Sequence, residues 1–131
     1  LRRRQRQMCI RDRRLVVDAV REHSWRGDRR PTSHISEILQ DADRLDALGA
    51  VGIYRAFAYG VHAGREFCDL EDPLAERREP DESRYTLDHF FTKLLRLGEY
   101  MNTEPARREA ERRIEFMRLY LEELKREALL A

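Results

Sequence analysis

An apolar stripe near the C-terminal end is the feature that most constrains the fold. Apolar residues recur every three or four positions from Ala106 to Ala128, which is the spacing of one face of an α-helix. Asn102 and Thr103 precede the stripe with side chains that cap helices, and Pro105 lies in the first turn, where a missing N–H has no cost. The segment therefore predicts a long helix with one buried face. Its stripe consists of Ala106, Ala110, Ile114, Met117, Leu121, Leu124 and Ala128.

Three more segments have helical periodicity. We expect helices over residues 15–23, 33–60 and 85–100, because apolar residues repeat in each of them with a helical period. Gly49 and Gly52 are expected to weaken or bend the second of these helices. No segment shows the alternation of apolar and polar residues that is typical of a strand. The sequence predicts an all-α fold in which the helices form a bundle.

Length and composition limit the class of protein. The chain has 131 residues, enough for one domain or part of one. The longest apolar run, residues 47–54, is far shorter than the roughly 20 residues of a membrane-spanning helix. Cys9 and Cys68 lie far apart, without the spacing of a zinc site or a disulfide framework. We therefore expect a cytoplasmic protein with no membrane partner.

The net charge of +1 is the sum of two unlike parts. Residues 1–14 carry a charge of +6, and the rest of the chain carries −5. Most of the negative charge lies in residues 62–84, which hold eight acidic residues and four arginines and show little periodicity. Aperiodic segments of this length are usually functional loops or disordered insertions. We expect a mobile, solvated insertion, and a lid is the alternative.

Three carboxylates stand close together in residues 40–47, on a helix that is otherwise apolar on one side. They are Asp41, Asp43 and Asp46. A carboxylate at the margin of a core stripe is costly to desolvate unless it meets a cation, several donors or a metal ion. The alternative is that Arg44 and other arginines pair with these carboxylates at the surface.

Several spaced motifs together resemble a known family. Residues 41–47 read DADRLDA, residues 49–53 read GAVGI and residues 55–57 read RAF. The other matching motifs are His23-Ser24-Trp25, His89-Phe90, Lys93-Leu94-Leu95, Asn102-Thr103 and the spaced set Ala110, Arg113, Phe116 and Met117. In this order they resemble the second half of an HD-domain phosphohydrolase of the small bacterial YedJ/YpgQ-like branch.

The resemblance implies a fold and an activity. HD-domain proteins are all-helical and are named for their H…HD…D ligands, which hold a divalent metal ion for the hydrolysis of phosphate esters or pyrophosphates. The resemblance implies Mn, Mg, Fe, Co or Zn as the metal of the intact parent and a small phosphorylated molecule, such as a nucleotide, as its partner. It assigns metal binding to Asp43, catalysis to His23 and Asp46, and phosphate binding to Lys93, His89 and Arg113.

Each of these assignments has a structural alternative. An imidazole at a helix C-terminus, such as His23, commonly interacts with the helix dipole. His89 would otherwise make a core hydrogen bond, Lys93 would be solvated, and Arg113 would form a salt bridge in a chain rich in arginine.

The sequence departs from the family pattern at the metal ligands. Its histidines are His23, His34, His62 and His89, and none of them is followed by aspartate. The first His and the His-Asp pair of the motif are therefore absent. We expect residues 15–131 to be the C-terminal part of an HD-type domain, truncated at its N-terminal side, inactive as it stands and unable to bind a metal ion stably. Helix faces left uncovered by the truncation would favour self-association.

Two other functions stay open. A non-enzymatic helical interaction module is the first alternative. The second is nucleic-acid binding by the Arg-rich residues 1–14. Against this second alternative, no aromatic residue is interleaved with those arginines to stack on bases. Residues 1–14 match nothing in the family, and residues 8–13 resemble translated sequencing-adapter read-through, so we expect this segment to be artefactual or disordered.

Overall fold

The computed structural model describes residues 10–23 and 30–129. Within these ranges the protein is helical, and the all-α prediction is confirmed. The helices are α1 (Ile10–Glu22), α2 (His34–Asp46), α3 (Gly49–His62), α4 (Asp88–Thr92), the 3₁₀-helix η3 (Leu94–Tyr100) and α5 (Glu104–Leu129). Most of residues 1–14, including the arginines before Ile10, lie outside the described residues, and α1 begins five positions before the predicted helix start.

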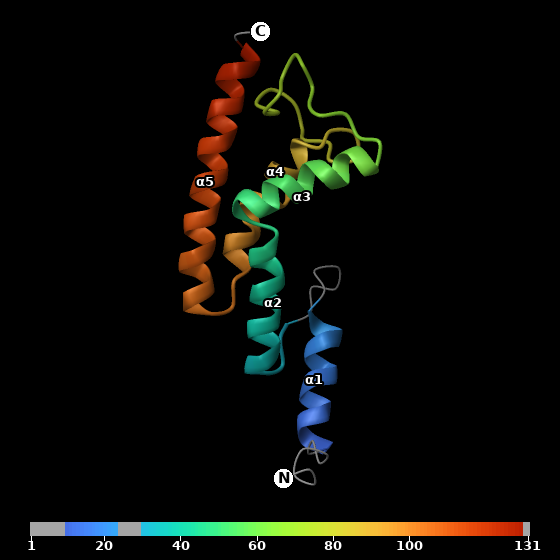
Figure 1. The fold of residues 1–131 in the computed structure, drawn as a ribbon, viewed down its shortest axis with the longest axis vertical. Coiled ribbons are helices and arrows are strands. Elements are labelled where there is room, and N and C mark those ends of the chain that lie inside the picture. The colour runs from blue at the N-terminus through green and yellow to red at the C-terminus, as the bar shows by residue number, and fades with distance from the viewer. Residues whose placement is uncertain (1–9, 24–29, 130–131) are drawn as a thin grey trace.

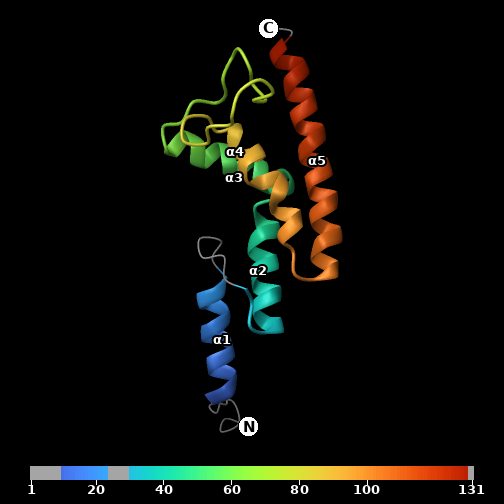
Figure 2. The same cartoon turned by 180° about the vertical axis from the view of Figure 1, so that it is seen from behind.

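Figure 1 shows an elongated arrangement with α1 at one end, next to α2, and the C-terminal part of α5 at the opposite end. The long helix α5 runs along the other side of the molecule, and α3 begins beside the middle of α5 and extends away from it (Figure 1). In the view from behind, η3 lies between α2 and α5 (Figure 2). None of the helices in the described part of the chain is long and apolar enough to span a membrane.

The predicted stripe of α5 forms one wall of the core. Most of its members are buried, while Leu124 is half-buried and the side chain of Ala128 lies outside the described part. The opposite walls come from α3, α4, η3 and the turn before α3. The buried apolar residues of these walls are Leu48, Ile53, Leu87, Phe90, Leu94, Leu97 and Met101.

The predicted helix over residues 33–60 is two helices in the structure. The chain leaves α2 after Asp46 through a tight turn. In this turn the N–H groups of Ala47 and Leu48 donate to the carbonyl oxygens of Arg44 and Leu45, respectively, at 3.1 Å each. Gly49 then adopts φ +72° at the start of α3. This left-handed conformation costs a residue with a Cβ about 1–2 kcal/mol, so glycine permits an abrupt change of direction instead of the expected bend.

The predicted helix over residues 85–100 is also divided. Lys93, with φ −136° and ψ −59°, interrupts the α-helical geometry between α4 and η3. A 3₁₀-helix has three residues per turn, so Leu94 and Leu97 lie on the same face of η3. Both are buried in the core.

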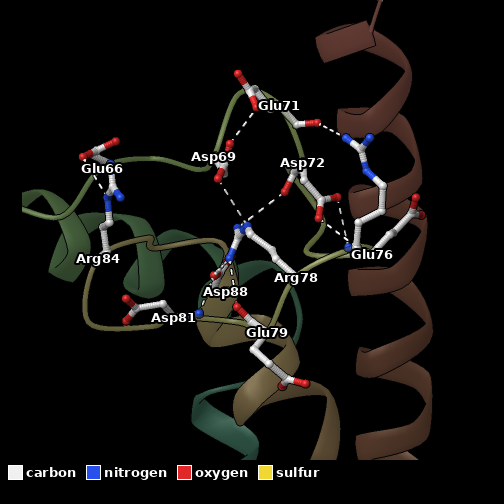
Figure 3. Close-up of polar contacts among 11 residues, drawn as sticks. Glu66, Asp69, Glu71, Asp72, Glu76, Arg78, Glu79, Asp81, Arg84 and Asp88 are labelled. Carbon is white, nitrogen blue, oxygen red and sulfur yellow. Dashed lines mark hydrogen bonds and ion pairs between the residues drawn. The ribbon is translucent and has the colours of Figure 1, made fainter.

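The acidic segment of residues 62–84 has no helix of its own, but it is held at several points. Its start pairs with the chain before α4, through a bridge between Glu66 and Tyr85 and a hydrogen bond from the N–H of Leu87 to the carbonyl of Phe67 at 3.0 Å. Figure 3 shows Arg78 at the centre of this segment, directed toward Asp88. The mobility of the segment stays a prediction.

Candidate functional site

A pocket of about 350 Å³ lies between α3 and the chain around α4. One wall is made by α3, which presents Tyr54, Arg55 and Tyr59, and both tyrosines are exposed. The pocket is also lined by Ala47, Gly52, Ala56, Ala58, Arg65, Thr86, His89, Lys93 and Leu94.

The lining is rich in basic groups from three parts of the chain. Arg55 lies on α3, Arg65 follows that helix, and Lys93 is the residue that separates α4 from η3. The guanidinium of Arg65 lies over the ring of Tyr59, with its central carbon 5.4 Å from the ring centroid. No acidic residue lines this pocket among the described residues, so anions are the ligands that its charge favours.

Two of the three predicted phosphate-binding residues lie in this pocket. His89 and Lys93 are four positions apart, and both contribute to the lining although the helix is interrupted at Lys93. The Nδ1 atom of His89 lies 2.8 Å from a carboxylate oxygen of Glu82. The same oxygen accepts a hydrogen bond from the hydroxyl of Thr92 at 2.5 Å. These bonds, from Thr92 first and then from His89, lower the pKa of Glu82.

Arg113, the third predicted phosphate-binding residue, lies elsewhere. Its guanidinium donates to the carbonyl oxygen of Leu45 and to the carboxylate of Glu109, at 2.7 Å in both cases. Arg113 thus joins α5 to the C-terminal end of α2. Its carbon chain also packs against Gly49, because a Cβ at that glycine would lie 3.2 Å from the Arg113 Cγ.

The predicted catalytic residues are not in the lining of the pocket. Asp46 lies at the end of α2 and forms a salt bridge with Arg55, which also donates to the Asp46 carbonyl oxygen at 3.2 Å. Arg55 therefore connects Asp46 to the edge of the pocket. His23 follows α1 and is exposed, with its Nδ1 atom 2.5 Å from the carbonyl oxygen of Val20. Ser24 and Trp25 of its motif lie outside the described residues.

The three carboxylates of residues 40–47 have different environments. Asp43 and Asp46 are exposed, whereas Asp41 is only 3% exposed. Asp41 accepts four hydrogen bonds from Asn102 and Thr103, two from backbone N–H groups and two from side chains, at 2.7–3.0 Å. A carboxylate at the margin of the core needs a cation, several donors or a metal ion, and Asp41 meets several donors.

The described residues do not provide a complete metal site. No three His, Cys, Asp or Glu side chains in this part of the chain come together in a way that could hold a metal ion. Asp43 would offer a single exposed carboxylate on α2. The residues present therefore do not fit the H…HD…D set that the family resemblance implies.

Sequence reasoning missed part of the pocket. Arg65 gave no signal of its own, since it is one arginine in a segment that otherwise reads as solvated and acidic. Tyr54 and Tyr59 are identifiable as pocket residues only once the face of α3 is known. Arg55 belongs to the RAF motif, and it both pairs with Asp46 and lines the pocket.

Comparison with known proteins places the chain beside a group of bacterial proteins. No family model matches the sequence. The chain is 42% identical over 97 residues to the uncharacterized protein YpgQ of Bacillus subtilis (strain 168), an overlap of 74% of this chain and 42% of that protein.

Solved structures give the same relationship. The crystal structure of Bacillus subtilis YpgQ in complex with ADP has a TM-score of 0.74 and 37% identity, over 92% of this chain and 54% of that chain. An HD-superfamily hydrolase from Bacillus thuringiensis has a TM-score of 0.61 and 43% identity, over 72% of this chain and 46% of that chain. The chain thus spans about half the length of the relatives that it matches.

Proposed function

We infer the function of this chain from the premise that it is a homologue of YpgQ-like HD-superfamily hydrolases over about half of their length. This homology confirms the family resemblance in the sequence motifs and the all-helical, HD-like fold. We propose that the parent protein is a metal-dependent phosphohydrolase that acts on nucleotides or other small phosphate esters or pyrophosphates. In this proposal, the described part of the chain contributes the phosphate-recognition side of the site.

The observation that carries this proposal is the basic pocket between α3 and α4. Arg55, Arg65 and Lys93 line one cavity, and within residues 10–23 and 30–129 no acidic residue contributes to that lining. Guanidinium groups bind phosphate through two parallel hydrogen bonds, and an ammonium group adds a compact charge. The exposed rings of Tyr54 and Tyr59 offer aromatic surface next to these charges. The similar protein YpgQ was crystallised in complex with ADP, which combines a diphosphate with an aromatic base. The basic and aromatic side chains of this pocket are suited to those two parts of a nucleotide.

The metal ion belongs to the parent protein in this proposal. It would act as a Lewis acid and activate a water molecule for hydrolysis. Asp43 would be one of its ligands, with His23 and Asp46 as catalytic groups and Arg113 as a further phosphate contact. The described residues do not gather a ligand set, so in this proposal the other ligands of the metal ion would come from the parent protein.

Titration with ADP tests the pocket. We expect ADP to shift the NMR signals of residues that line the pocket, and Lys93→Gln to weaken ADP binding by about 10- to 150-fold, because a hydrogen bond to a charged group contributes about 1.5–3 kcal/mol. Lys125→Gln is the matched control, since Lys125 lies on α5 and pairs with Glu76. Equal losses of affinity in the two variants would contradict the assignment of the pocket.

A hydrolysis assay tests the predicted inactivity. We expect the chain to show no turnover of ADP or pyrophosphate in the presence of Mn²⁺, since it lacks the first His and the His-Asp pair. Turnover that disappears in Asp43→Asn would overturn this expectation.

A second candidate function is a non-enzymatic interaction module, and one specific observation favours it. Apolar side chains of the neighbouring helices α1 and α2 are exposed, among them Val16, Val20, Ile35 and Ile38. Apolar surface of this kind favours association. Light scattering coupled to gel filtration distinguishes the candidates, because the module predicts an assembly that Val20→Ser and Ile38→Ser dissociate without any effect on ADP binding.

A further inference from the structure

Glu82, in the acidic segment, makes two contacts with one face of α4. Its carboxylate oxygen Oε2 lies 2.8 Å from His89 Nδ1 and 2.5 Å from the hydroxyl oxygen of Thr92. His89 and Thr92 are three positions apart and therefore lie on the same side of a helix. The side chain of His89 is 24% exposed and that of Glu82 is 46% exposed, so neither group is isolated from water.

The ionisation of Glu82 determines where the proton of His89 lies. Hydrogen bonds from Thr92 and His89 lower the pKa of Glu82, so this carboxylate is ionised at neutral pH. An ionised carboxylate accepts hydrogen bonds and cannot donate them. His89 must therefore donate, which requires a proton on Nδ1.

The other ring nitrogen remains for the pocket. A neutral imidazole with a proton on Nδ1 has a lone pair on Nε2, at the opposite edge of the ring. His89 lines the basic pocket, and Nε2 has no hydrogen-bond partner within the described part of the chain. Arg55, Arg65 and Lys93 are the charged groups that share this lining.

The backbone before Glu82 is fixed by the residue that precedes His89. Buried Asp88 accepts hydrogen bonds from the N–H of Asp81 at 2.6 Å and from both terminal nitrogens of Arg78, at 2.5 and 2.9 Å. Figure 3 shows Asp81 and Arg78 on opposite sides of Asp88. The backbone carbonyl oxygen of Asp81 accepts a hydrogen bond from the N–H of Tyr85 at 2.9 Å, and this bond closes the turn that contains Glu82. Glu82 and His89 are thus held in place through their neighbours as well as through their own contact.

We propose that Glu82 is a positioning residue that holds His89 in the Nδ1-protonated form and presents its Nε2 atom to a phosphate-bearing ligand in the pocket. The neutral ring accepts a proton or a hydrogen bond at Nε2, and the protonated ring donates from the same atom to a phosphate oxygen. This role rests on the proposed function of the pocket as a phosphate site. It also gives a role to the acidic segment, which supplies Glu82 and Arg65.

The ring nitrogen signals of His89 test the proposal without a ligand. In long-range ¹H–¹⁵N spectra at a pH at which the ring is neutral, we expect the wild-type chain to show the Nδ1-protonated tautomer. In Glu82→Ala we expect the Nε2-protonated tautomer to be populated, and in Glu79→Ala, an exposed glutamate of the same segment, no change. A wild-type ring protonated on Nε2 overturns the proposal, and this result requires no variant to fold.

Binding of inorganic pyrophosphate is the second measurement. We expect Glu82→Ala to weaken it by roughly two- to tenfold, the range of one hydrogen bond of 0.5–1.5 kcal/mol, and Glu79→Ala to leave it unchanged. If the wild-type chain binds pyrophosphate and Glu82→Ala changes neither the tautomer nor the affinity, the positioning role is wrong and the phosphate pocket stands. If the wild-type ring is Nδ1-protonated but pyrophosphate does not bind, the proposed function fails and the contact that orients His89 is supported.

Discussion

The carboxylate of Asp41 accepts two hydrogen bonds from Thr103, one from its N–H group at 2.8 Å and one from its hydroxyl at 2.7 Å. The two residues lie on different elements, since Asp41 is in α2 and Thr103 immediately precedes α5. Asn102 adds two more hydrogen bonds to the same carboxylate. One buried acidic side chain therefore fixes the start of the longest helix against α2.

We expect Asp41→Asn to lower the free energy of unfolding by about 2–4 kcal/mol. An amide has one oxygen acceptor in place of two, so buried donors of Asn102 and Thr103 would lose their partner, at about 1–3 kcal/mol for each unsatisfied group. Asp43→Asn is the control on the same helix, and because Asp43 is exposed we expect a change within about 0.5 kcal/mol. Urea unfolding measures both values, and similar values for the two variants would contradict the role of Asp41.

We expect Arg78→Met to lower the free energy of unfolding by about 3 kcal/mol. Asp88 is completely buried and Arg78 is its cationic partner, so the variant leaves a buried carboxylate without its counter-charge. Arg84→Met removes an exposed pair with Glu66 and should change the stability by less than about 1 kcal/mol. Hydrogen exchange adds a local test, because the amide of Leu87, bonded to Phe67, should exchange faster in Arg78→Met than in Arg84→Met.

Gly49→Ala should be more destabilising than Gly64→Ala. Both glycines have positive φ, +72° and +69°, so each alanine incurs a backbone cost of about 1–2 kcal/mol. A Cβ at Gly49 would also lie 3.2 Å from Arg113 Cγ, whereas the space around Gly64 is open. Thermal unfolding of the two variants measures the difference, and an equal effect would show that Arg113 yields without cost.

Acidification should destabilise the protein between about pH 4.5 and pH 2. Hydrogen bonds from Arg112 and Arg113 lower the pKa of Glu109 from 4.5 to about 2, and those from Thr92 and His89 lower the pKa of Glu82 from 4.5. In this range the unfolded chain binds more protons than the folded one, so the stability present above pH 4.5 is lost as the pH falls. Thermal midpoints across this range measure the loss, and Glu109→Gln should make the pH dependence shallower. A midpoint that stays constant in the wild-type chain would rule out this linkage.

Local patterns predicted some features of the fold well and others poorly. The buried face of α5 follows from helical spacing alone, because a long amphipathic helix has one apolar side wherever it packs. The division at Gly49 does not follow, since a glycine within a helical pattern lowers helix propensity whether the chain bends or turns sharply. The separation of α4 from η3 at Lys93 does not follow from local spacing either, because it depends on the tertiary packing of Leu94 and Leu97 in the core.

The candidate site shows the same limit. His89 and Lys93 could be paired from their spacing, because helical geometry brings residues four positions apart to one side. Sequence could not distinguish the buried Asp41 from the exposed Asp43, since the donors that surround Asp41 come from residues about 60 positions later. Arg65 and Glu82 reach the site because of the path that the acidic segment follows, and no local sequence rule predicts that path.

The short turn between α2 and α3 has a consequence for how this chain tolerates changes in length. Only Ala47 and Leu48 separate the two helices. An added residue would disrupt the hydrogen bonds of Ala47 and Leu48 that close this turn, and α3 would have to shift relative to α2 unless the extra residue bulged outward. A shift of α3 would separate Arg55 from Asp46 and change the wall of the pocket that α3 provides. The turn therefore sets the spacing of the two helices, and we expect an insertion here to be less well tolerated than one in the long segment between α3 and α4.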